Sequence, residues 1–185
     1  IAYAARNPGR VKALVLYGTF ARGKLTGSPE LVEAVKSVVK VEWGLGSKLL
    51  TDLFVGQDAP SGMAEFFTAY QRAGATAEDA YAMLVATLAI DVRDMLPSVK
   101  APTLVMHARD DKIVPIDLGR EIAAGIRDAR FLSIDGSHVS GAVDKQRLDM
   151  SLAFLLEHTG AKPRQSRPRR SGTAPPPAAR PTQSC

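Results

Sequence analysis

Three short apolar segments stand out along the 185-residue chain. They cover residues 13–17 (ALVLY), 103–107 (TLVMH) and 130–134 (RFLSI), and residues that favour turns lie beside each of them. Short, continuous apolar runs are typical of strands that are buried on both faces of a parallel sheet. The pattern therefore predicts three strands of such a sheet.

Helical periodicity separates and follows these segments. Between the second and third segments, Leu118, Ile122 and Ile126 recur at every fourth position, which predicts a helix and hence a right-handed strand–helix–strand unit. A last amphipathic helix is predicted over residues 144–158, with Gly160 just past its end. The predicted fold class is α/β, with helices flanking a parallel sheet.

Residues 23–96 differ from the rest, because they show helical periodicity and no convincing strand. Ser28, which precedes a proline, predicts a capped helix start. Thr76 and Asp79 have the spacing of a capping pair ahead of another apolar stretch. We therefore predict three or four helices inserted between strands of the sheet.

The segment 161–185 is rich in proline, arginine and serine, and it contains six lysines and arginines but no acid. Removing these six positive charges from the formal net charge of +5 leaves the rest of the chain at −1. A segment of this composition cannot bury enough apolar surface to fold, so it is predicted to be a disordered tail. The nearly neutral remainder gives no electrostatic reason to expect a nucleic-acid partner.

Composition also excludes several kinds of site. The single cysteine, Cys185, allows neither an internal disulfide nor a thiolate metal cluster, and no phosphate-binding loop is present. The longest apolar runs are far shorter than the roughly 20 residues of a membrane-spanning helix. We predict a cytoplasmic protein without cofactor, metal or membrane partner, which acts on a small-molecule substrate or ligand.

Two carboxylates and a histidine follow two of the predicted strands. Asp110 and Asp111 come just after residues 103–107, and His138 comes just after residues 130–134. Sites in open parallel sheets form at the carboxyl ends of the strands, so one carboxylate can reach Nδ1 of His138 and leave Nε2 to accept a proton. The residues alone leave a second interpretation open, in which the aspartates form a solvated turn and the histidine is an ordinary loop residue.

The order of these motifs resembles the α/β-hydrolase family. Residues 107–115 (HARDDKIVP), a helix, a strand and residues 136–138 (GSH) are similar to the acid and histidine loops of that family. Residues 1–18 resemble the helix after its nucleophile elbow and the strand that follows. The resemblance covers residues 1–160 and implies an incomplete α/β-hydrolase domain with a helical cap at about 23–96.

The resemblance also implies the roles of individual residues. Asp111 takes the place of the acid of a catalytic triad, with Asp110 as the less favoured candidate, and His138 takes the place of the base. Ala108 departs from the pattern, since the family usually has glycine there. We expect an altered acid loop unless the φ angle of Ala108 is negative.

The nucleophile of such a triad lies on a G-x-S-x-G elbow, which this sequence lacks. The elbow would come immediately before Ile1, so the resemblance implies the C-terminal part of a longer hydrolase that is inactive by itself. Ser137, Ser140 and Cys185 are poor substitutes, because none of them is expected to approach a substrate carbonyl from the required side. An aspartate nucleophile in the elbow is an open alternative to serine.

Two functions follow from these observations. The first is a hydrolase of the serine type that cleaves an ester, acyl or related small-molecule substrate. The alternative is a non-catalytic, ligand-sensing domain of a regulatory protein. Residues 16–18, 21–23 and 90–94 look most like family members fused to nucleotide cyclases or helix-turn-helix regulators, which implies such a fusion in the parent protein.

The remaining candidates are better explained by structure. His107, at a predicted strand end, is expected to pack or to form a hydrogen bond, and His158 is expected to end a helix. Six aromatic side chains of residues 23–96 are expected to form the core of the cap, with some facing a substrate: Trp43, Phe54, Phe66, Phe67, Tyr70 and Tyr81.

Overall fold

A three-stranded parallel sheet forms the centre of the computed structural model, which describes residues 1–56, 60–139 and 145–161. The strand order is β1-β2-β3. In chain order the elements are α1 (Ala2–Arg6), β1 (Leu14–Tyr17), α2 (Pro29–Val41), α3 (Trp43–Val55), α4 (Met63–Gly74), α5 (Ala77–Leu88), the 3₁₀ helix η1 (Arg93–Ser98), β2 (Thr103–Ala108), α6 (Ile116–Gly125), β3 (Arg130–Ile134) and α7 (Lys145–Thr159).

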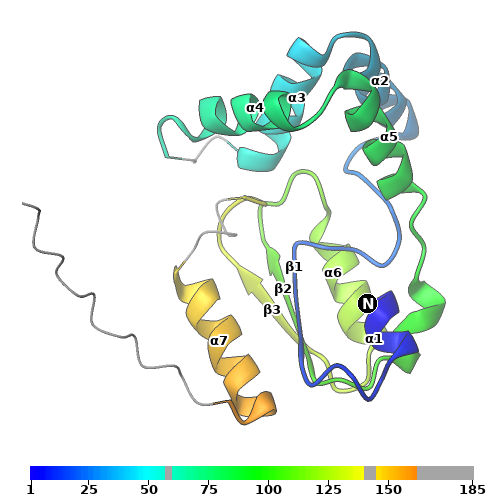
Figure 1. Ribbon diagram of the computed structural model, residues 1–185, viewed down its shortest axis with the longest axis vertical. Helices are drawn as coiled ribbons and strands as arrows, with labels where there is room; N and C mark the ends of the chain where they lie inside the picture. Colours follow the sequence, from blue (N-terminus) through cyan, green and yellow to red (C-terminus); the bar gives the residue numbers. More distant parts are fainter. Residues whose placement is uncertain (57–59, 140–144, 162–185) are drawn as a thin grey trace, which may run out of the picture.

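The three predicted strands and their parallel pairing are confirmed. Leu14 is paired with Thr103, and Leu104 is paired with Arg130, so both ladders run in the same direction. Helix α6 connects β2 and β3 as the predicted strand–helix–strand unit. All three strands point their carboxyl ends toward helices α2–α5 (Figure 1).

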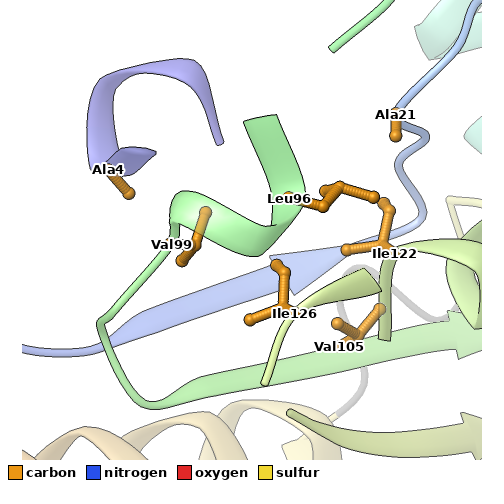
Figure 2. Packing of buried hydrophobic residues seen from close by; sticks show 7 residues of the cluster. All are labelled: Ala4, Ala21, Leu96, Val99, Val105, Ile122 and Ile126. Carbon is orange, nitrogen blue, oxygen red and sulfur yellow. The ribbon is translucent and has the colours of Figure 1, made fainter. Parts of the chain in front are cut away.

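Helices cover both faces of the sheet, which explains why most positions of its strands are apolar. Helices α1, η1 and α6 lie on one face, and α7 lies on the other (Figure 1). Val105 of β2 packs with Ile122 and Ile126 on the α6 side (Figure 2). Its neighbour Met106 points the opposite way and packs with Phe154 of α7. Alternate residues of one strand therefore contribute to two separate apolar layers.

Helices α2–α5 form the predicted insertion between β1 and β2. Within the described residues they are four helices, and the expected caps are present: the Ser28 side chain accepts from the Leu31 amide, and Thr76 and Asp79 form a reciprocal capping box. The two ends of the insertion meet at an isolated antiparallel bridge between Arg22 and Asp91. The chain therefore leaves the sheet and returns to it at one place.

The predicted tail lies outside the described residues except for Ala161, and so does the predicted first residue of the last helix, Asp144. Among the described residues, no helix combines the length and the apolar character needed to cross a membrane.

Candidate active site

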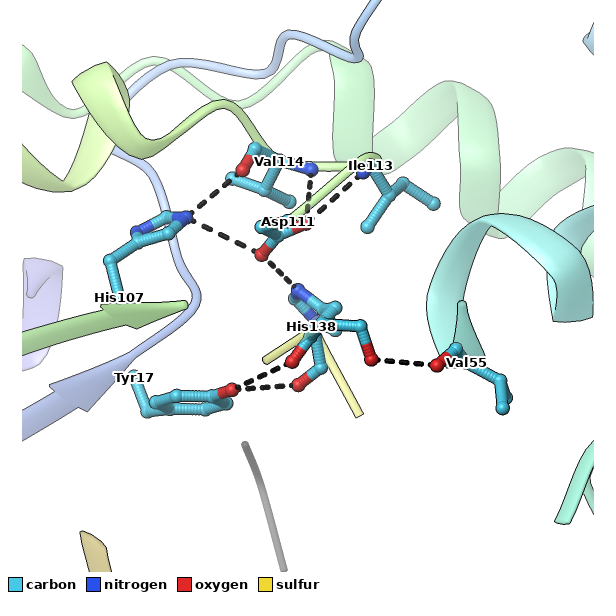
Figure 3. Close-up of polar contacts among 8 residues, drawn as sticks. Tyr17, Val55, His107, Asp111, Ile113, Val114 and His138 are labelled. Atoms are coloured by element: carbon cyan, nitrogen blue, oxygen red, sulfur yellow. Dashed lines mark hydrogen bonds and ion pairs between the residues drawn. The ribbon is translucent and has the colours of Figure 1, made fainter. Parts of the chain in front are cut away.

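The loops after β2 and β3 bring an acid and a histidine into contact (Figure 3). Oδ2 of Asp111 lies 2.6 Å from Nδ1 of His138. Oδ1 of the same carboxylate accepts from the backbone amides of Ile113 at 3.0 Å and Val114 at 2.9 Å, which folds the acid loop into a turn around its own side chain. Asp110 is exposed to solvent. The structure thus brings Asp111, and not Asp110, to the histidine.

The carboxylate of Asp111 is buried but well supplied with hydrogen-bond donors. Its side chain has no exposed surface. Burial by itself raises the pKa of Asp111, but hydrogen bonds from His107, His138 and the Val114 amide outweigh this effect and hold the pKa well below its ordinary value. The carboxylate is therefore ionised near neutral pH and can only accept hydrogen bonds. It follows that Nδ1 of His138 carries a proton and that Nε2 is the basic nitrogen.

The lowered pKa of Asp111 makes stability depend on pH in a known direction. A depressed pKa in the folded state stabilises the fold above the unfolded value of 3.8, and this contribution is lost as the pH falls through the folded value. We expect the free energy of unfolding to fall more steeply below about pH 5 in the wild type than in Asp111→Asn. Urea unfolding of both forms at a series of pH values measures the difference, and equal slopes would contradict it.

The imidazole of His107 also contacts the carboxylate of Asp111. The side chain is fully buried, its Nε2 lies 2.9 Å from the carbonyl oxygen of Val114, and the same atom lies 3.4 Å from Oδ2 of Asp111. Both neighbours are acceptors, so Nε2 carries the proton. The expectation of a packing or hydrogen-bonding role for His107 is confirmed. Its contact with the acid itself was not foreseen.

Gly119 of α6 leaves the space that the ring of His107 occupies. A Cβ atom added at Gly119 would lie 2.5 Å from Nδ1 of that ring. We expect Gly119→Ala to lower the free energy of unfolding by about 1–3 kcal/mol, because the ring is buried and cannot move without disturbing the acid loop. Gly74→Ala, where an added Cβ meets nothing within 4 Å, is the matched control. Equal stability of the two variants in urea unfolding would argue against this packing.

The histidine loop is fixed from two sides. The hydroxyl of Tyr17, the last residue of β1, donates to the carbonyl oxygen of His138 at 2.8 Å. Ser137 donates its hydroxyl proton to the carbonyl oxygen of Val55 in α3 at 2.6 Å, so this hydroxyl serves the contact with the inserted helices. The ring of Phe54 meets the imidazole edge-on, at a centroid distance of 5.3 Å. The position of His138 therefore depends on both the sheet and helix α3.

Gly18 follows Tyr17 and lies directly against the imidazole. Its φ is +53°, and an added Cβ would come within 3.0 Å of Cε1 of His138. We expect Gly18→Ala to cost about 1–2 kcal/mol of backbone strain and also to displace the ring. Gly160→Ala separates the two effects, because Gly160 has a φ of +65° but open space around it. Only Gly18→Ala is expected to shift the imidazole NMR signals of His138, and unchanged signals would contradict the placement of Gly18.

Other sequence expectations have plain outcomes. Asp128 is the one non-glycine residue with positive φ in the described ranges, so Ala108 has a negative φ and does not distort the acid loop. Ser140 and Cys185, the alternative nucleophiles, lie outside the described residues. Where the structure describes the chain, no group of three histidine, cysteine or acidic side chains is arranged to hold a metal ion.

A cavity of about 460 Å³ lies between the inserted helices and the strand ends. His138 and Gly18 line it from the sheet side, and Phe54, Trp43 and Tyr70 line it from the helical side. Its volume falls within the range of pockets that bind small molecules. His138 thus lies in the wall of a ligand-sized cavity, while its Nδ1 is engaged in the hydrogen bond to Asp111.

No family model matches the chain, but individual known proteins are similar to it in sequence or in structure. The chain is 31% identical over 140 residues to the 2-hydroxy-6-oxononadienedioate/2-hydroxy-6-oxononatrienedioate hydrolase of Cupriavidus pinatubonensis. This alignment covers 71% of the chain and 48% of that hydrolase. The chain therefore spans about half the length of this relative.

Two solved structures have the same arrangement of strands and helices. The enol-lactonase of Burkholderia xenovorans LB400 is 25% identical, with a TM-score of 0.66 over 86% of this chain and 60% of that one. MGS-M2, an α/β-hydrolase enzyme from a deep-sea metagenome library, is 19% identical, with a TM-score of 0.64 over 90% and 62% of the two chains. The chain has the α/β-hydrolase fold, over a part that corresponds to about 60% of these structures, and its homologues include hydrolases.

Proposed function

We propose that Asp111 and His138 are the acid and the base of a catalytic triad in a hydrolase that cleaves an ester, a lactone or a related acyl substrate. The observation that carries the proposal is the 2.6 Å hydrogen bond between the buried, ionised Asp111 and Nδ1 of His138, at the wall of a cavity. The likeness to an enol-lactonase supports the substrate class.

The geometry suits proton transfer at Nε2 of His138. When a nucleophile attacks a substrate carbonyl, Nε2 takes its proton, and the carboxylate of Asp111 stabilises the resulting imidazolium. The imidazolium then gives this proton to the departing alcohol, and an acyl–enzyme bond is left. A water molecule, deprotonated by the same nitrogen, cleaves that bond and restores the nucleophile.

We place the nucleophile in a part of the protein outside these 185 residues. Proton transfer from the nucleophile to His138 requires a serine; an aspartate would attack as a carboxylate with no proton to give, and His138 would then act only on the water molecule. Within residues 1–56, 60–139 and 145–161, Nε2 of His138 has no hydrogen-bond partner. The chain also spans only 48% of its dioate-hydrolase relative. On this proposal the chain supplies the acid, the base and one wall of the substrate cavity, and it has no turnover by itself.

The test compares the 185-residue chain with a protein extended at its N-terminus by the genomic sequence that precedes Ile1. We expect the extended protein to hydrolyse p-nitrophenyl acetate and the chain alone to leave it intact. Turnover by the chain alone that disappears in His138→Ala would overturn the placement of the nucleophile. An extended protein that binds ligand without hydrolysing any ester would instead support a ligand-sensing domain. The fusion to a cyclase or a helix-turn-helix regulator stays a prediction.

A further inference from the structure

The cavity beside His138 is lined mainly by uncharged side chains. Among the described residues that line it, none is a lysine, an arginine or an acid, and only His138 and Tyr70 can ionise. Most of the wall is made of apolar side chains, including Leu50 and Leu84. Away from His138, a ligand with a buried negative charge would find no lysine or arginine in the described part of this wall, and an uncompensated buried charge is strongly unfavourable.

The strongest N–H donors of the wall are already engaged within the inserted helices. Nε1 of Trp43 donates to the carbonyl oxygen of Ala75 at 2.9 Å. The amide nitrogen of Gln71 donates to the carbonyl oxygen of Ser47 at 3.0 Å and to Oγ1 of Thr51 at 2.7 Å, which uses both of its protons. Neither side chain can therefore offer a hydrogen bond to a carboxylate without breaking a bond inside the helical layer.

The nearby cations are also held elsewhere. Arg72 of α4 donates to Oγ of Ser47 at 2.8 Å and to the carbonyl oxygen of Gly44, and Lys40 lies 4.9 Å from the ring centroid of Tyr81. Neither cation is among the described residues that line the cavity. The helical layer thus keeps its positive charges out of the site.

We propose that this cavity binds the uncharged, apolar acyl or alkyl part of a substrate and discriminates against substrates with a carboxylate there. This inference rests on the proposed function, because it assigns the cavity to the substrate of His138. The apolar wall favours an aliphatic or aromatic group through burial of its surface. The described wall holds no lysine or arginine, and its Trp43 and Gln71 N–H donors are engaged, so a carboxylate at the same position is penalised.

Trp43 gives a direct probe of the cavity, because it is the single tryptophan of the chain and lines the wall. The experiment is a fluorescence titration of the full chain with ethyl hexanoate and with monoethyl adipate, which differ only in a terminal methyl and a carboxylate. We expect saturable binding of ethyl hexanoate and at least about 10-fold weaker binding of monoethyl adipate, since a tenfold ratio needs only a small part of the cost of burying a charge. Equal or tighter binding of the carboxylate, or no saturable binding of the ester, would overturn the proposal.

A charge-introducing variant sharpens the test. Met83→Arg places a cation at the exposed rim of the cavity, and Val85→Arg places the same charge on the same helix away from it. We expect Met83→Arg to reduce the preference for the ester by at least about threefold and Val85→Arg to leave it unchanged, because only the first provides a nearby counter-charge. The opposite ranking would contradict the proposal. Binding does not require hydrolysis. The titration can therefore fail or succeed independently of the turnover assay that tests the proposed function.

Discussion

Replacement of Asp111 by alanine is expected to lower the free energy of unfolding by about 3–5 kcal/mol, which is the range for removing one partner of a buried charged pair. The carboxylate accepts from Nδ1 of His138 and from the amides of Ile113 and Val114, and it lies 3.4 Å from Nε2 of His107. Alanine leaves these donors without their acceptor in a buried place, and each such group costs about 1–3 kcal/mol. Urea unfolding followed by tryptophan fluorescence measures the loss.

The neighbouring aspartate provides the control for this experiment. Asp110 is exposed, and its carboxylate takes no part in the network around His138. Asp110→Ala is therefore expected to stay within about 0.5 kcal/mol of the wild type, as surface substitutions usually do. If both alanine variants lost the same stability, the carboxylate of Asp111 would not be the centre of the network that we describe.

Replacement of His138 by alanine is expected to lower kcat about 10²–10⁴-fold in the N-terminally extended protein, the usual contribution of a general base. The substitution removes the atom that accepts the proton of the nucleophile. It also leaves the Asp111 carboxylate with one donor fewer. Since the cavity wall is otherwise intact, KM for a p-nitrophenyl ester is expected to change much less than kcat.

His158 gives a matched control for that measurement, because it is a histidine of the same chain on a different element. It lies near the end of α7, where its ring packs on Phe154 at a centroid distance of 4.5 Å. His158→Ala is expected to keep kcat within about twofold of the wild type, since no part of it contacts the acid–base pair. A similar loss of kcat in both variants would point to general destabilisation instead of a catalytic role for His138.

The fold could be predicted from local patterns because its strands, which helices cover on both faces, are short runs of mostly apolar residues. The strand predicted at residues 130–134 matches β3, and the one predicted at residues 103–107 ends one residue before β2 does. The helix caps at Ser28 and Thr76 were equally visible, since they depend on residues within one turn. Where a few neighbouring residues determine the local structure, the sequence was sufficient to predict it.

The acid and the base could be predicted for a related reason. Asp111 and His138 follow neighbouring parallel strands, and the carboxyl ends of such strands meet at one edge of the sheet. The same rule applies to Tyr17 and Gly18 at the end of β1, although their chemistry gave no signal. Only the folded chain shows that one anchors the histidine loop and that the other makes room for its ring.

Contacts between distant segments could not be predicted. The bridge between Arg22 and Asp91, and the bond from Ser137 to the carbonyl oxygen of Val55, depend on how the inserted helices dock on the sheet. His107 is an intermediate case. It lies two residues after Val105 and so faces α6, but only the fold shows that the acid loop returns over its ring.

The most direct test of the acid–base pair is the protonation state of the His138 ring in the 185-residue chain, read from ¹⁵N–¹H NMR correlations of its imidazole. In the neutral ring we expect the proton on Nδ1, held in the hydrogen bond to Asp111, and an unprotonated Nε2. We also expect Asp111→Asn to abolish this preference. A neutral ring that carries its proton on Nε2 in the wild type would contradict the account, because that nitrogen could not accept the proton of a nucleophile.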